Sequence, residues 1–157
     1  MGRFMNHKKW VVVLALIATA LILTHLPVSE ADAAASASDF QIEGSTLTKY
    51  RGTDERVTIP DTVEVVGESA FENNQKVQLV VVPKSVKRMD AYVFWGCDNL
   101  EEVVLGKGLT AVDEYAFAGC TGLKQITIPE NVQSIDAQAF AGCTNLTDIY
   151  IPDTVTN

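Results

Sequence analysis

Residues 126–148 read ITIPENVQSIDAQAFAGCTNLTD, and the same pattern occurs three times before them. The earlier copies are VTIPDTVEVVGESAFENNQKVQL at 57–79, VVVPKSVKRMDAYVFWGCDNLEE at 80–102 and VVLGKGLTAVDEYAFAGCTGLKQ at 103–125. A fifth copy begins as IYIPDTVTN at 149–157. Self-similarity at a fixed period of 23 residues predicts a stack of coils in which each repeat packs against its neighbours.

Apolar side chains recur at the same positions of every repeat, and one repeat holds too few of them to close a core. Stacked in register, they form continuous ladders from coil to coil. A phenylalanine ladder (Phe71, Phe94, Phe117, Phe140) is followed by a cysteine ladder (Cys97, Cys120, Cys143). We predict a structural role for both ladders, with the cysteines as buried thiols. Stacking would also bring cysteine Cα atoms within disulfide range, but their side chains would point the same way.

The local pattern within a repeat predicts one strand and one tight helical segment. A triplet such as Ile126-Thr127-Ile128 indicates a short strand with one buried side. The following proline, replaced by Gly106 in one copy, cannot donate a hydrogen bond and ends the strand. An aspartate four residues before the phenylalanine and a glycine two residues after it favour a capped helical turn. The predicted fold class is an α/β-type solenoid, with one short parallel strand and one short helical or 3-10 turn per 23-residue coil.

The IPxxVxxI-like stretch, the Ala-Phe pair and the Gly-Cys pair, clearest from Ile128 to Cys143, resemble the BspA-type leucine-rich repeats, a class of bacterial surface proteins. The resemblance covers residues 57–157 and implies a leucine-rich-repeat array that serves adhesion or binding without catalysis. The stretch FQIEGSTLTKYRG at 40–52 is similar to the lead-in of such arrays. We therefore expect residues 40–56 to form a capping hairpin.

The first 33 residues have the order of a secretory signal peptide. Three basic residues precede an apolar run from Trp10 to Leu26, and small residues follow it. We expect cleavage after Ala33, with Ala37 as the alternative site and 34–39 as a flexible linker. An uncleaved membrane anchor is the competing interpretation, although the run is slightly short for a span. The predicted location is secreted or at the cell surface.

The part of the chain after residue 33 is acidic. Without Arg3, Lys8 and Lys9 it keeps nine of the twelve basic residues, and without Glu30 and Asp32 it keeps eighteen of the twenty acidic ones, so the formal net charge is −9. Nucleic acids and anionic membranes both require a basic surface. The charge therefore argues against nucleic acid, and against a membrane beyond the signal segment, as partners.

The residue types also argue against catalysis and metal binding in this segment. Both histidines, His7 and His25, lie within the predicted signal peptide, which leaves no base for a serine or cysteine nucleophile and no imidazole for zinc. Adjacent carboxylates such as Glu101 and Glu102 point to opposite faces of a strand. A column of aspartates offers one carboxylate per coil, whereas calcium needs six to eight oxygens around one ion. The aspartate column consists of Asp90, Asp113 and Asp136. We predict that this segment has no enzymatic activity, metal or cofactor.

The outward-pointing positions of the predicted strands are the best candidate for ligand binding, because repeat arrays bind through extended surfaces. A small apolar strip lies there beside two lysines, and a tyrosine of the kind enriched at binding hot spots stands farther along. The candidate residues are Leu79, Val81, Lys84, Val104, Lys107, Thr127 and Tyr150. The expected partner is a protein or glycan at the cell surface.

Two further functions fit the sequence: N-terminal targeting repeats of a larger secreted cell-wall or carbohydrate-active enzyme, and a structural spacer. The last triplet, Ile149–Ile151, begins a coil that residue 157 leaves incomplete, and we interpret the chain as a fragment of a longer protein. A truncated gene, or an open edge that pairs with a partner strand, are the alternatives.

Overall fold

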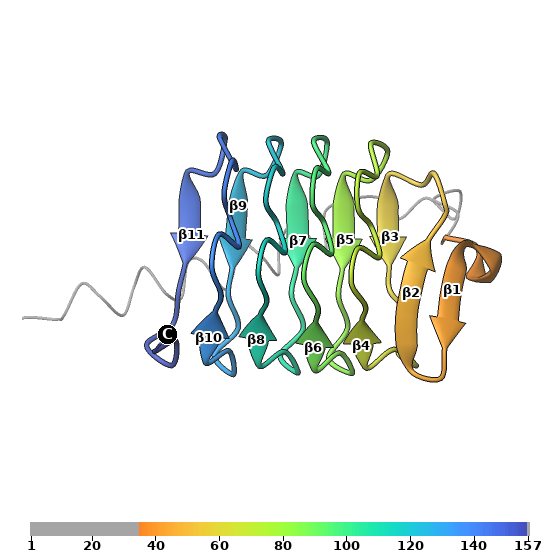
Figure 1. Ribbon diagram of the computed structural model, residues 1–157, viewed down its shortest axis with the longest axis horizontal. Coiled ribbons are helices and arrows are strands. Elements are labelled where there is room, and N and C mark those ends of the chain that lie inside the picture. The colour runs from red at the N-terminus through yellow and green to blue at the C-terminus, as the bar shows by residue number, and fades with distance from the viewer. Residues whose placement is uncertain (1–34, 157) are drawn as a thin grey trace, which may run out of the picture. The chain divides into compact units, whose positions relative to one another are not determined.

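The computed structural model describes residues 35–156, so the predicted signal peptide lies outside the described residues. The repeats form coils that lie side by side along the long axis of the array, with two rows of short strands (Figure 1). In this range no helix has the length and apolar character needed to cross a membrane.

Each coil contributes one three-residue strand to a five-stranded parallel sheet. Neighbouring strands pair with an offset of one repeat, so that Val57 lies opposite Val80 and Ile126 opposite Ile149. In the first four strands the central residue is buried, as alternation along a strand requires. The strands are β3 (Arg56–Thr58), β5 (Leu79–Val81), β7 (Glu102–Val104), β9 (Gln125–Thr127) and β11 (Asp148–Tyr150).

A second parallel sheet runs along the other row, so the prediction of a single strand per coil is wrong. The four strands that the repeats contribute to this six-stranded sheet are only two residues long, too short to display the period of two by which strands are found in a sequence. Only the apolar column formed by their second residues was visible as a pattern. They are β4 (Val65–Val66), β6 (Arg88–Met89), β8 (Ala111–Val112) and β10 (Ser134–Ile135).

The predicted helical turn is also wrong, because three overlapping tight turns take its place. In the third coil the N–H groups of Ala116, Ala118 and Cys120 each donate to the carbonyl three residues earlier, over 3.3, 3.0 and 3.1 Å. Within these turns Tyr115 and Gly119 have φ values of 55° and 74°. A residue in this left-handed region stops a helix.

The alternate backbone donors of these turns join one coil to the next. The N–H groups of Tyr115, Phe117 and Gly119 donate to carbonyls of the following coil over 3.3, 2.8 and 2.7 Å. A helix would use these donors internally. The turns therefore extend the inter-coil hydrogen bonding of the two sheets, and the only helix among residues 35–156 is the 3-10 helix η1 (Ala37–Asp39).

A hairpin covers the first coil. Strands β1 (Phe40–Glu43) and β2 (Thr46–Tyr50) form an antiparallel pair. On its other side β2 pairs in parallel with β4, the first strand of the second sheet. The Tyr50 ring lies 5.0 Å from the Phe71 ring, and Phe40 lies 5.1 Å from Tyr50. Two aromatic side chains of the hairpin thus shield the first ring of the phenylalanine ladder.

The phenylalanine ladder forms the centre of the core. Successive ring centroids from Phe71 to Phe140 lie 5.1, 5.4 and 5.2 Å apart. Phe71, Phe94 and Phe117 are fully buried, and Phe140, in the last complete repeat, is partly buried. The coils therefore stack in the register that the 23-residue period implies.

The cysteines lie beside this ladder as free thiols. The thiols of Cys97, Cys120 and Cys143 each donate to the phenylalanine carbonyl of the preceding coil, at 3.1 Å. Burial raises the pKa of Cys97 to about 12 and raises the pKa of Cys120 and Cys143 as well. Because the thiolate is the nucleophile, the raised pKa values lower the reactivity of all three, most strongly for the fully buried Cys97 and Cys120.

We expect iodoacetamide at pH 8 to modify Cys143 first and to leave Cys97 and Cys120 unmodified until the array unfolds. The reason is that Cys143 is only partly buried, whereas the other two are fully buried. Mass spectrometry of digests taken with and without urea would measure this order. Rapid alkylation of Cys97 in the absence of urea would contradict the assignment of a closed core.

Candidate binding face

The outward-pointing side chains of the five-stranded sheet form one flat surface, which we call the outer strand face. The first four strands bury their central residue and direct the two flanking residues outward, and β11 follows the same alternation with its central residue exposed. These flanking residues are exposed or half-buried. The face consists of Arg56, Thr58, Leu79, Val81, Glu102, Val104, Gln125, Thr127, Asp148 and Tyr150.

Three of the predicted site residues come together in the middle of the outer strand face. Val81 of β5 pairs with Val104 of β7, and Leu79 lies two residues before Val81 on the same strand. All three side chains are half-buried. They form the apolar strip that the sequence predicts, and Glu102 lies opposite Leu79 at its border.

Lys84 and Lys107 lie just beyond this apolar strip, in the turns that follow β5 and β7, and both are exposed. The ion pairs found among residues 35–156 are Arg88–Asp90 and Lys124–Glu101. Neither Lys84 nor Lys107 has a carboxylate partner within this range. The strip therefore has two adjacent positive charges available to a ligand.

Tyr150 lies apart from this group, on β11. Its side chain is 48% exposed, and its hydroxyl donates to Glu130 Oε1 at 2.9 Å. That hydrogen bond, with a smaller effect of burial and of the Glu130 and Asp153 charges, raises the pKa of Tyr150. Thr127 stands between Tyr150 and the strip, so the seven predicted residues do not form one compact site.

A shallow polar depression of about 600 Å³ lies beside Tyr150. Its only ionisable lining residue is Glu130, so it offers hydrogen bonds without an acid–base pair. Thr154 donates to the Val132 carbonyl at 2.9 Å, and Asn131 to the Lys107 carbonyl at 2.6 Å. The lining residues are Thr110, Glu130, Asn131, Gln133, Thr154 and Thr156.

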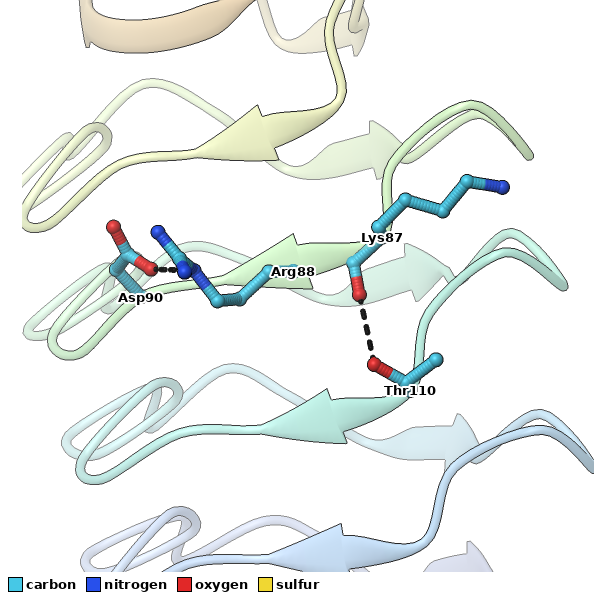
Figure 2. Close-up of polar contacts among 4 residues, drawn as sticks. All are labelled: Lys87, Arg88, Asp90 and Thr110. Atoms are coloured by element: carbon cyan, nitrogen blue, oxygen red, sulfur yellow. Dashed lines mark hydrogen bonds and ion pairs between the residues drawn. The ribbon is translucent and has the colours of Figure 1, made fainter.

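The aspartate column follows the strands of the second sheet. Figure 2 shows Arg88 Nε bound to Asp90 Oδ1 at 2.6 Å, and the Thr110 hydroxyl donating to the Lys87 carbonyl at 3.2 Å. Burial, together with the charges of Asp136 and Asp90, raises the pKa of Asp113, while Arg88 opposes the shift. Residues 35–156 contain no group of three or more His, Cys, Asp or Glu side chains arranged to hold a metal ion.

Asp113→Asn should raise the free energy of unfolding at pH 7. The folded pKa of Asp113 is raised above its ordinary value, so its ionised form disfavours folding. That penalty is complete above the folded pKa and disappears as the pH falls below the unfolded value of about 3.9. The stabilisation by asparagine should shrink from pH 6 to pH 3 in urea unfolding experiments. A constant difference across this range would show that the Asp113 charge does not matter.

One partly exposed group of aromatic side chains was not predicted from the sequence. Tyr92 and Tyr115 stack in adjacent coils, and Trp95, 42% exposed, packs edge-on against Tyr92. The signal was present in the alignment as a tyrosine two residues before the phenylalanine in two copies. This group was not predicted because its position depends on the left-handed backbone of the two tyrosines. A residue other than glycine gives no sign in the sequence that it adopts this conformation.

The sequence and the fold are both similar to those of known bacterial repeat proteins. Residues 49–157 match the family described as BspA type leucine rich repeat region (6 copies). A leucine rich cell surface protein from Faecalibacterium prausnitzii is 34% identical, with a TM-score of 0.69 over 71% of this chain and 30% of the other. The leucine rich repeat protein of T. pallidum is 28% identical, with a TM-score of 0.76 over 78% and 63%.

A leucine-rich repeat protein from Bacteroides capillosus is 29% identical, with a TM-score of 0.58 over 71% of this chain and 97% of the other. The chain thus spans less than two thirds of the length of the first two structures. No functionally curated protein matches it. The repeat period, the stacked coils and the family match over residues 49–157 confirm the resemblance: this chain belongs to the BspA-type leucine-rich repeat family.

Proposed function

We propose that this chain is a non-catalytic recognition module at a bacterial cell surface, and that it binds a protein partner through the outer strand face. The location is supported by the Faecalibacterium relative, which is described as a cell surface protein. The binding role is supported by the geometry of the face. Rigid parallel coils present a fixed array of side chains, so little conformational entropy is lost on binding.

The observation that carries this proposal is the apolar strip of Leu79, Val81 and Val104 beside Lys84 and Lys107. Strands favour β-branched residues, but the equivalent positions of β3 and β9 hold Thr58 and Thr127. Threonine therefore suffices for the strand, and the valines place additional apolar area at the surface. An apolar centre with charges at its rim is the usual composition of a protein–protein interface.

The test uses surfaces coated with decellularised extracellular matrix and biolayer interferometry of the full chain. Val81→Thr combined with Val104→Thr keeps the shape and strand propensity but removes apolar area, and should weaken binding about tenfold. Lys84→Ala with Lys107→Ala should slow association and reduce its dependence on salt. Thr144→Val, at an exposed position outside the outer strand face, is the control and should bind as the parent chain does.

Treatment of the matrix separates the classes of partner. Protease digestion should abolish binding if the partner is a protein, whereas periodate oxidation of sugars should leave it intact; the reverse result would identify a glycan. Unchanged binding by the double valine variant would contradict the proposal and favour a spacer role. A catalytic domain elsewhere in a longer parent protein would instead favour targeting repeats of an enzyme.

A further inference from the structure

Three aromatic side chains, the exposed Trp95 and the half-buried Tyr92 and Tyr115, gather on the tight turns of the second and third coils, away from the outer strand face. The Tyr92 and Tyr115 rings lie 5.1 Å apart and only 5° from parallel. Trp95 lies 6.5 Å from Tyr92 at 88°, and 42% of it is exposed. We call these three residues the aromatic turn cluster. The hydrophobic core leaves them out, because Val93 and Phe94 fill the buried positions of the same turn.

The two tyrosines occupy a costly backbone position. Their φ values are 59° and 55°, in the left-handed region that bulky residues avoid. The equivalent residues of the first and fourth coils, Ser69 and Gln138, share this conformation, with φ of 57° in both. The fold therefore needs a left-handed residue here but does not need an aromatic one, so the repeat geometry does not account for the two tyrosines.

Carboxylates flank the cluster. The residue before each left-handed position is Glu68, Ala91 and Glu114 in the first three coils, so small Ala91 lies between two exposed glutamates. The coils are in register at this point, because the Ser69 N–H donates to the Ala91 carbonyl and the Tyr92 N–H to the Glu114 carbonyl, both at 3.2 Å. Two coil spacings separate the glutamate positions by about 10 Å.

The charge around the cluster is negative. Neither Glu68 nor Glu114 forms an ion pair among residues 35–156. The nearby Lys49 directs its Nζ to the Ser69 carbonyl, at 2.9 Å. Burial first, and then the Glu114, Tyr115 and Glu68 groups, raise the pKa of Tyr92.

We propose that the aromatic turn cluster, with Glu68 and Glu114, binds an arginine side chain of a protein partner. A planar guanidinium stacks on aromatic rings and pairs with carboxylates at the same time. Small Ala91 stands between the two glutamate positions, and the ring planes of Tyr92 and Trp95 are nearly perpendicular, at 88°. A lysine ammonium would gain the charge attraction but not the stacking, so arginine is the preferred ligand.

Trp95 reports on this site directly. The chain has two tryptophans, Trp10 and Trp95, so Trp10→Phe leaves Trp95 as the only indole of the full chain. Titration with a hexa-arginine peptide at about 0.15 M salt, where weak surface attraction is screened, should give a saturable change in Trp95 fluorescence. A hexa-lysine peptide should bind about tenfold more weakly.

Matched variants test the assignment. Glu68→Gln with Glu114→Gln should weaken hexa-arginine binding about tenfold, whereas Glu43→Gln with Glu55→Gln, the same charge change elsewhere, should not. Tyr92→Ser copies Ser69 at the same backbone position and should also weaken binding while the array stays folded. Val81→Thr with Val104→Thr should leave hexa-arginine binding unchanged, so failure of this inference and failure of the proposed function are separable.

Two results would overturn the inference. Equal affinity for the arginine and lysine peptides, with equal losses in both glutamine pairs, would mean that the peptides respond only to net charge. A saturable fluorescence response to a neutral oligosaccharide such as maltohexaose, without one to hexa-arginine, would assign the cluster to sugars instead.

Discussion

Phe117→Ala is expected to lower the free energy of unfolding by about 3–5 kcal/mol, because it opens a cavity in the middle of the array. The Phe117 ring is fully buried and stacks between Phe94 at 5.4 Å and Phe140 at 5.2 Å. Both neighbouring rings are held by their own coils and cannot collapse far into the space. Urea titration followed by circular dichroism gives the change from the midpoint and slope.

Two variants serve as controls for this measurement. Thr127→Ala lies on the exposed face of β9 and should cost well under about 1 kcal/mol. Phe140→Ala removes a ring that is only partly buried and should fall between the other two. Equal losses from Phe117→Ala and Thr127→Ala would contradict the assignment of inner and outer faces.

Gly108→Ala is expected to cost about 3 kcal/mol, the upper part of the range for overpacking a closed site. A Cβ atom at Gly108 would collide with the carbonyl oxygens of Lys84 and Val86, both backbone atoms of the preceding coil. Neither can move without disturbing the contact between coils. Thermal and urea unfolding would both register the loss.

Lys107→Ala is the matched control for Gly108→Ala, since its side chain is exposed in the same turn and should change stability by less than about 0.5 kcal/mol. Gly106→Pro tests the same contact between coils. The variant restores the proline that the other repeats carry, yet a Cβ at Gly106 would collide with the Pro83 carbonyl. The substitution should therefore destabilise the folded protein although it restores the consensus residue. A stabilised Gly106→Pro variant would show that the two coils can separate at this turn.

The features that follow from the repeat period could be predicted from the sequence. A 23-residue period brings the same side chain to the same place in every coil, so the family and the stacked parallel coils followed from it. The tight turns did not follow, because aspartate before and glycine after a phenylalanine also describe a capped helix. The deciding feature was the conformation of Tyr92 and Tyr115, and a non-glycine residue carries no sign of a positive φ.

The candidate site shows the same division. Alternation along a strand placed Val81 and Val104 outward and Val80 and Val103 inward, which is how the structure arranges them. The second sheet and the aromatic turn cluster depend on two-residue strands and on turn geometry. Neither feature produces a periodic pattern long enough to recognise in the sequence, so both became apparent only in the structure.

The hydrogen bonds that the tight turns and both sheets direct from coil to coil also affect how the length of the array can change. Each coil binds only the one before it and the one after it, at a constant offset of 23 residues. Gain or loss of one whole unit by unequal recombination would recreate the same junctions and leave no mismatched seam. Variation in unit number among related genes is therefore the mildest kind of change this architecture permits.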